Sequence, residues 1–182
     1  AGDYTTDDIW SRKDAAGVTV KEALDGIGYR GSETVGQRKL SAFLELHIEQ
    51  GPLLEAEGKT VGVVDRGQGI IWYDGRVTGF ESHAGTTPMP LRRDALSALS
   101  ELTLAIEKIA LAHAPNAVAT IGEVNIANPS RNVIPGEIAF TLDVRSPDAA
   151  VMDALDHGIR AALDEIAKRR RVEIALDQIW RK

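Results

Sequence analysis

Residues 137–145 read Glu-Ile-Ala-Phe-Thr-Leu-Asp-Val-Arg, so large apolar side chains alternate with polar or small ones along the whole stretch. Alternate residues of a β-strand point to opposite faces, and this period of two therefore predicts a strand with one buried face. Ser146-Pro147-Asp148 follows at once and predicts a helix start, with Ser146 as N-cap, proline in the first position and an acidic residue in the first turn.

The neighbouring segments extend this strand and helix into a complete fold. The helix is expected to run to about Arg169 and to bury Met152, Leu155, Ile159, Leu163 and Ile166. A final strand follows from Val172. Upstream we predict a strand over 70–80, with a turn at Asp74-Gly75 as an alternative, then a helix over about 92–113 and a strand over 118–126. The order β-α-β-β-α-β predicts an α+β, ferredoxin-like domain: a four-stranded antiparallel sheet with both helices on one face.

The sequence before residue 67 has a different character, and we place a domain boundary between residues 66 and 67. Residues 1–35 are loop-rich, with one short helix expected at Thr19–Leu24 behind a capping box. An apolar run over 39–47 predicts a strand, Gly51-Pro52 opens a short helix to about residue 57, and residues 61–65 predict a buried strand.

Composition narrows the class of protein. The 182 residues are 43% hydrophobic and 26% charged, which is ordinary for a globular protein. A net charge of −6 argues against a nucleic-acid partner, and no apolar window is long enough for a membrane span. The absence of cysteine restricts any metal ligands to His, Asp or Glu and favours a cytoplasmic setting. The basic run 168–171 is expected to stabilise the carbonyl end of its helix.

Two histidines lie among small and polar residues beside turns. His47 ends a predicted strand, and Gln50 follows it. Taken alone, the two residues are better explained as a hydrogen-bonded structural histidine and a capping or exposed glutamine than as a metal ligand and a substrate contact. His83 lies in a loop fixed by Gly85 and prolines, where its ring could donate a hydrogen bond to a developing oxyanion. The alternative is a loop histidine bonded by Thr86 or Thr87.

Two further polar residues flank the strand at 137–145. Arg145 lies at its end on the face away from the core, and arginine is suited to bidentate recognition of a carboxylate. The alternative is an ion pair with Asp143 or Asp148. Asn132 lies at the entry to the same strand, where it could also form an Asx turn before Pro135.

Several segments in this order resemble the M20-type amidohydrolases that cleave N-carbamoyl-L-amino acids, allantoate or β-ureidopropionate. The segments that carry the resemblance are 45–52, 62–65, 82–89 with 92–96, 132–136 and 141–146. The resemblance implies that residues 1–66 are a partial strip of a metal-dependent α/β catalytic domain. It also implies that residues 67–182 are a lid and dimerisation domain, and this agrees with the β-α-β-β-α-β order.

The resemblance also implies roles for individual residues. His47 would be a metal ligand, and Gln50 would contact the substrate. His83 would polarise the scissile carbonyl in the active site of the partner subunit, while Asn132 and Arg145 would bind the substrate's carboxylate. Complete members of the family use two divalent metal ions, zinc or manganese, and act on small ureido or carbamoyl amino acids as homodimers.

Segments that would supply the other metal ligands and the general base are not found in this sequence. We therefore expect a central fragment of an amidohydrolase that holds no metal stably and is inactive by itself, with no nucleic-acid or membrane partner. Two alternatives remain. One is a non-catalytic ferredoxin-like dimerisation module; the other is an M20 peptidase, although the peptidases usually carry a carboxylate where this chain has His47.

Overall fold

The computed structural model describes residues 4–33 and 39–182. The chain divides into two compact units, Ala1–Val61 and Gly62–Lys182. The division lies a few residues before the boundary that the sequence predicts, and each unit is described by itself below.

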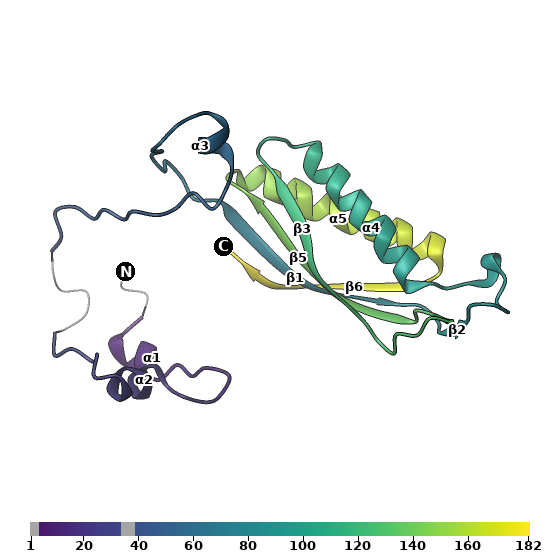
Figure 1. Cartoon of the computed structure of the whole chain (residues 1–182), viewed down its shortest axis with the longest axis horizontal. Coiled ribbons are helices and arrows are strands. Elements are labelled where there is room, and N and C mark those ends of the chain that lie inside the picture. The colour runs from purple at the N-terminus through teal and green to yellow at the C-terminus, as the bar shows by residue number, and fades with distance from the viewer. Residues whose placement is uncertain (1–3, 34–38) are drawn as a thin grey trace. The chain divides into compact units, whose positions relative to one another are not determined.

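The second unit is a four-stranded sheet with two long helices on one face (Figure 1). Its strands are β1 (Gly69–Thr78), β3 (Val118–Ile126), β5 (Glu137–Ser146) and β6 (Glu173–Arg181). The helices are α4 (Ala95–Leu111) and α5 (Ala149–Arg170). The strand order is β3-β5-β1-β6, and every neighbouring pair is antiparallel. The α+β class and the predicted β-α-β-β-α-β order are confirmed.

The core lies between the sheet and the two helices. Strand β5 alternates along its length between buried and half-buried residues, and its buried apolar residues are the predicted ones: Ile138, Phe140, Leu142 and Val144. All five residues predicted to face inward from the second helix are buried in α5. Burying an apolar side chain of this size stabilises the fold by about 1.5–3 kcal/mol, so the pattern of period two in β5 and the helical pattern in α5 fix which face of each element turns inward.

Two details of this domain differ from the sequence prediction. Ser146 is the last residue of β5 and is buried, whereas Asp148 is the N-cap of α5 and accepts from the amides of Ala150 and Val151. The Ser146 hydroxyl instead accepts from the Asp148 amide at 3.1 Å. An Asp N-cap satisfies the free amides of a first turn as well as a serine does. The strand therefore ends one residue later than predicted, and the N-cap of the helix lies two residues later than predicted.

The alternative of a turn at Asp74-Gly75 is wrong, because β1 runs unbroken through both residues. Gly75 pairs with Phe140 across the sheet, and a Cβ at this position would overlap the Phe140 ring. A glycine inside a strand commonly marks such a close approach.

Shorter elements complete the second unit. A two-stranded ribbon joins β2 (Ser82–His83) to β4 (Val133–Ile134), and a 3-10 helix, η1, spans Met89–Leu91. Among the helices that the structure describes, none combines the length and apolar content that crossing a bilayer requires.

The first unit consists of short helices and irregular chain: α1 (Thr6–Trp10), α2 (Val20–Gly26) and α3 (Leu53–Ala56). The predicted capping box of α2 is confirmed, with reciprocal hydrogen bonds between Thr19 and Glu22. Helix α1 was not predicted, although Thr5 and Asp8 form the same motif.

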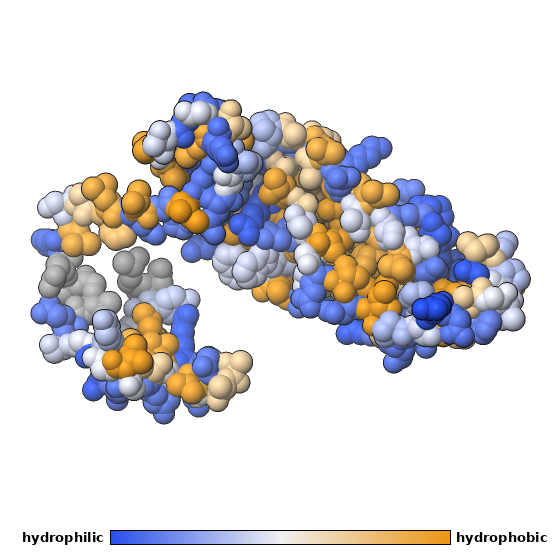
Figure 2. Space-filling model, in the orientation of Figure 1, coloured by the Kyte–Doolittle hydropathy of each residue, from blue (hydrophilic) through white to orange (hydrophobic). Residues whose placement is uncertain are grey.

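The two strands predicted in this part of the chain are wrong. Residues 39–47 and 61–65 have no regular secondary structure, and their apolar side chains reach solvent: Leu46 is fully exposed and Val63 is 93% exposed. Figure 2 shows apolar side chains at the surface along this part of the chain. A strand forms only where a neighbouring strand satisfies its backbone, and within the described residues nothing pairs with either run.

The basic run at the end of α5 has a more specific role than the predicted one. Arg169 and Arg170 both bind the Glu101 carboxylate of α4, Arg169 at 2.7 Å, and they thereby join the two helices. Arg171 donates to the main-chain carbonyls of Pro90 and Arg92. The bond from Arg170, with Arg169 beside it, lowers the pKa of Glu101 to about 2 although partial burial opposes the shift.

This shift predicts a stability change at acid pH. Because the folded pKa is depressed, the contribution of Glu101 is present above the ordinary carboxyl pKa of about 4.5 and is lost as the pH falls toward 2. We expect Glu101→Gln to remove about 1–2 kcal/mol of unfolding free energy at pH 7 and almost none at pH 2. Urea unfolding at both pH values measures the difference. An equal loss at the two values would show that packing, not charge, is what the substitution removes.

Candidate functional site

His83 and Asn132 are brought together by the β2–β4 ribbon. His83 pairs with Val133, and the amide of Ala84 donates to the Asn132 main-chain oxygen at 2.9 Å. The two candidate residues, 49 positions apart in the numbering, therefore lie on adjacent backbone segments. The ribbon is the element that makes them neighbours.

The imidazole of His83 is held by main-chain amides. Gly85 and Thr86 donate from their backbone nitrogens to Nδ1, at 3.0 and 3.2 Å. A ring nitrogen that accepts two N–H groups carries no proton, so the proton of the neutral ring is assigned to Nε2. His83 is exposed, and Nε2 is thus a hydrogen-bond donor available to a ligand. The predicted alternative named Thr86 or Thr87 as the partner; the backbone of Thr86 is one of the two.

Asn132 is exposed directly before β4. Its side-chain oxygen accepts from the Ser130 hydroxyl at 2.8 Å, which fixes the orientation of the amide group. With the oxygen occupied, the NH₂ group is the part of this side chain that can donate to a carboxylate or carbonyl.

Arg145 occupies the other end of the domain. It pairs with Ile70 and Val118 across the sheet, and its guanidinium binds Asp143 through Nε at 3.0 Å and through a terminal nitrogen at 2.7 Å. The predicted ion pair with Asp143 is thus present, and it raises the pKa of Arg145 above the ordinary value. Asp143 engages one edge of the guanidinium, so the remaining N–H groups can still bind an anion.

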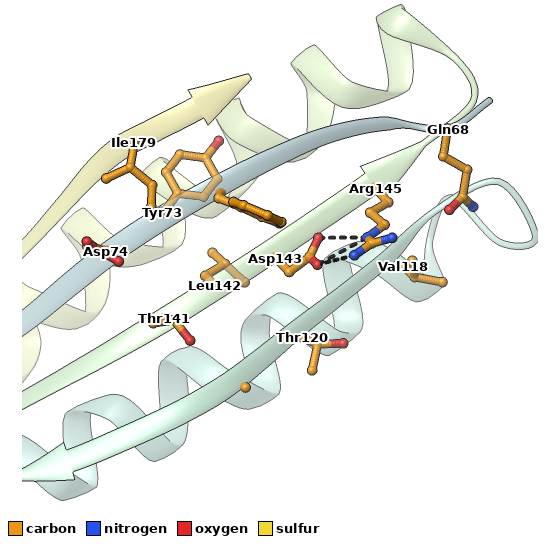
Figure 3. A pocket seen from close by; sticks show the side chains of 12 residues that line it. Gln68, Tyr73, Asp74, Val118, Thr120, Thr141, Leu142, Asp143, Arg145 and Ile179 are labelled. Atoms are coloured by element: carbon orange, nitrogen blue, oxygen red, sulfur yellow. Dashed lines mark hydrogen bonds and ion pairs between the residues drawn. The ribbon is translucent and has the colours of Figure 1, made fainter. Parts of the chain in front are cut away.

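Arg145 lines a depression of about 640 Å³ on the sheet face opposite the helices (Figure 3). The lining combines the Arg145–Asp143 pair with Gln68, Thr120, Trp72 and Ile179. Trp72 also packs against Trp180, with ring centroids 5.2 Å apart. A charged pair beside an aromatic wall is suited to a small molecule with one anionic and one apolar part. The sequence analysis did not single out Trp72, although its place between Ile71 and Tyr73 in an alternating strand puts it on this face.

The sheet keeps Arg145 away from His83 and Asn132. Asn132 precedes β4, and Arg145 is the last residue but one of β5, so the prediction that they flank one strand is wrong. Strand β5 separates Arg145 from Glu137 by eight steps, on the order of 25 Å at about 3.3 Å per residue. A small substrate cannot touch both groups of one chain.

His47 and Gln50 lie in the first unit, and both are exposed. His47 Nδ1 is 2.5 Å from the carbonyl oxygen of Ile48. Since a carbonyl only accepts, Nδ1 carries the proton, and Nε2 has the free lone pair that a metal ligand needs. Gln50 has a positive φ of 54°, and Glu49 beside it accepts from the first amides of α3 at 3.1 Å. The N-cap residue of α3 is Pro52, and the Glu49 side chain accepts from the free amides of the first turn in its place.

The described residues do not by themselves form a metal centre. Within residues 4–33 and 39–182, no group of three or more His, Asp or Glu side chains is placed to hold an ion. A catalytic zinc site takes three protein ligands, and His47 supplies one. The donor set in this part of the chain therefore does not fit a resident metal.

The second unit, with one helix-covered and one open sheet face and a polar loop at one end, is a small α+β domain. Residues 67–171 match the family described as the peptidase dimerisation domain. The chain belongs to this family, the dimerisation domain of M20-type enzymes.

Comparison with individual proteins extends the similarity to the whole chain. The chain is 40% identical over 179 residues to an N-carbamoyl-L-amino-acid amidohydrolase of Rhizobium meliloti, covering 98% of this chain and 43% of that protein. It is 35% identical to the allantoate amidohydrolase of Escherichia coli K12, with 94% and 43% covered. A solved hydantoinase/carbamoylase family amidase of Burkholderia multivorans is 48% identical, with a TM-score of 0.90 over 98% of this chain and 43% of its own. The chain thus spans less than half the length of the relatives it matches.

Proposed function

We propose that the protein containing this chain is an amidohydrolase that cleaves a linear ureido C–N bond in a substrate of the N-carbamoyl-L-amino-acid or allantoate type. The observation that carries the proposal is His83, whose ring is bonded at Nδ1 by two backbone amides and leaves Nε2–H exposed beside Asn132. The names of the relatives that match the chain over nearly its whole length support it.

His83 acts on the scissile carbonyl. When water adds to the carbonyl carbon, the oxygen gains negative charge, and the Nε2–H group donates a hydrogen bond to it. The C–N bond then breaks as the carbonyl re-forms: the amine leaves with a proton given up by the water, and the carbonyl carbon leaves with the water's oxygen as a carbamic acid. A donor held by fixed backbone amides needs no reorganisation at that moment, and this is the condition for strong transition-state stabilisation.

Arg145 and Asn132 both bind the carboxylate of the substrate. The free N–H groups of Arg145 bind the carboxylate, and the NH₂ group of Asn132 donates a hydrogen bond to it. Within one chain β5 places Arg145 on the order of 25 Å from Glu137, and Asn132 and His83 lie at the ribbon that precedes Glu137. We therefore propose that each active site takes His83 and Asn132 from one subunit and Arg145 from the other. The homodimer that a dimerisation domain forms supplies both, and Gln50 contacts the substrate from the catalytic part of the chain.

Two divalent ions, zinc or manganese, belong to this proposal, and when bound they supply an activated water. His47 would be one ligand through Nε2, and the protein that contains this chain would have to supply the others. We propose that the 182-residue chain alone holds no metal stably and is inactive. The cysteine-free composition supports a cytoplasmic location.

The test compares this chain with a protein of the length of its relatives that contains it. Both are assayed with N-carbamoyl-L-amino acids, allantoate and dipeptides, with bound metal determined by elemental analysis. We expect the longer protein to carry metal, to hydrolyse a carbamoyl or ureido substrate, and to lose activity on chelation. The 182-residue chain should do none of these.

Other outcomes favour other functions. Faster cleavage of dipeptides than of any carbamoyl compound would make the longer protein a peptidase. If the longer protein dimerises but hydrolyses none of these substrates, the non-catalytic dimerisation module is the function that remains. Turnover by the 182-residue chain would overturn the claim that it is inactive alone.

A further inference from the structure

The loop that carries His83 is a tight turn closed by the backbone. The Thr87 amide donates to the His83 carbonyl at 3.1 Å, while the amides of Gly85 and Thr86 point to Nδ1. The orientation of the imidazole therefore depends on the conformation of residues 84–87. A shift of this turn would remove both bonds to Nδ1 together.

The side chain of Arg92 clamps that turn at both ends. Its Nε donates to the Thr87 carbonyl at 3.1 Å, and a terminal nitrogen donates to the Ala84 carbonyl at 2.7 Å. Arg92 is half-buried, so these charge-assisted bonds are partly shielded from water and are stronger than neutral ones. No other side chain among the described residues bonds to these two carbonyls.

Arg92 itself stands on a fixed backbone. Its amide donates to the Met89 carbonyl at 3.3 Å at the end of η1, and its own carbonyl accepts from Arg171 at 3.2 Å. Arg171 directly follows α5, and its side chain also binds the Pro90 carbonyl. A continuous set of hydrogen bonds therefore connects the end of a core helix to the turn beneath His83.

We propose that Arg92 is a positioning residue for His83: by holding the Ala84 and Thr87 carbonyls it keeps the Gly85 and Thr86 amides on Nδ1 and thereby keeps the proton on Nε2. The structural half of this proposal stands on the contacts alone. Its catalytic consequence rests on the proposed function, because it matters only if Nε2–H acts on a substrate carbonyl.

The geometry requires arginine in particular. The two carbonyls, at the two ends of one turn, are bound through Nε and a terminal nitrogen of the same guanidinium. Because this group is planar, the directions of the two N–H groups are fixed relative to each other. Lysine would keep the positive charge but present a single ammonium on a flexible stem. Arg92→Lys therefore distinguishes the effect of the two hydrogen bonds from the effect of the positive charge.

Nuclear magnetic resonance of the 182-residue chain tests the structural half. Long-range ¹H–¹⁵N correlation at a pH where the ring is neutral reports which nitrogen of His83 is protonated. We expect the His83 ring of the wild-type chain to be protonated at Nε2. Arg92→Met should raise the ratio of the Nδ1–H tautomer to the Nε2–H tautomer about fivefold or more, which corresponds to the loss of one hydrogen bond. The Gly85 and Thr86 amide resonances should shift in the same variant. In Arg92→Lys the tautomer ratio should lie between those of the wild-type chain and Arg92→Met.

Arg93→Met is the matched control, because Arg93 is the adjacent arginine but donates to the Arg171 carbonyl and not to the turn. It should leave the His83 signals unchanged. Resonances of the buried core report whether each variant is folded. Unchanged His83 and amide signals in a folded Arg92→Met chain would overturn the proposal, and so would an equal change in Arg93→Met.

Kinetics of the longer protein test the catalytic half. We expect Arg92→Met to lower kcat about tenfold to a hundredfold with KM changed less than about threefold, since the interaction it weakens is made in the transition state. A rise in KM at unchanged kcat would mean that Arg92 binds substrate itself. If the wild-type protein hydrolyses nothing, the proposed function fails, while the resonance experiment still decides whether Arg92 positions His83.

Discussion

Mixing full-length subunits that carry His83→Ala with subunits that carry Arg145→Ala is expected to restore activity that neither variant has alone. Removal of a donor to a developing oxyanion costs about 10²–10³ in kcat, and loss of a bidentate carboxylate contact costs binding of similar size. Each homodimer of one variant has two defective sites. If a site takes His83 from one subunit and Arg145 from the other, a mixed dimer has one site with both defects and one site with neither.

The size of the recovery follows from random pairing in a twofold dimer. About half of the dimers are mixed and one of their two sites is intact, so the mixture should reach about a quarter of wild-type activity. The measurement is kcat per subunit after the two variants are mixed, unfolded mildly and reassociated. An activity that stays at the level of the single variants would mean that Arg145 and His83 do not serve a shared site.

Asn132 provides a matched control for the complementation. His83 and Asn132 lie at the same end of the domain, joined by the β2–β4 ribbon, so both reach the same site. A mixture of His83→Ala and Asn132→Ala subunits leaves one of the two residues missing from every site and should recover nothing. Arg145→Ala mixed with Asn132→Ala should recover as the first mixture does, because that pair is again divided between the two ends of the sheet.

The sequence predicted the second unit well because its determinants are local and repeat. Strand β5 alternates without interruption, and α5 carries apolar residues at helical spacing, so the buried face of each follows from periodicity alone. The N-cap of α5 was predicted at Ser146 and lies at Asp148. Residue type does not separate the two positions, because both side chains are good N-caps.

The strands predicted over 39–47 and 61–65 failed for a non-local reason. Apolar composition favours a strand, but pairing requires a second strand that no feature of these residues specifies. Leu46 and Val63 are exposed where a sheet was expected to bury them. A hydrophobic pattern predicts that burial of a segment would be favourable. It does not predict which other segment would cover it.

The candidate site was predicted in part for the same reason. His83 and Asn132 were recognised as candidates from their surroundings in the sequence. Their proximity depends on the β2–β4 ribbon, and the protonated nitrogen of His83 depends on two backbone amides. The residue types alone predict neither the hydrogen bonds of Arg92 to the turn nor the separation of Arg145 from His83. Both depend on the strand register and on the course of the backbone.

Gly75→Ala is expected to destabilise the domain by about 2–3 kcal/mol, a large effect for one methyl group. Its Cβ would overlap the ring of Phe140, which is 3% exposed and packed on all sides. Gly122 is the matched control in β3: a Cβ there would lie 3.8 Å from the Thr141 hydroxyl, an ordinary contact. Gly122→Ala should be neutral or slightly stabilising, and urea unfolding of both variants measures the difference.

A double-mutant cycle distinguishes this account from the turn that the sequence had offered. If Gly75 is needed to make room for a ring, replacing the ring relieves the strain, and Gly75→Ala with Phe140→Leu should lose clearly less than the sum of the two single losses. If Gly75 were needed for backbone freedom in a turn, the two losses would add, because no side chain opposite would change the strain. Coupling of at least about 1 kcal/mol would therefore show that this glycine serves packing across β1 and β5, and additive losses would show that the ring is not what excludes a side chain at position 75.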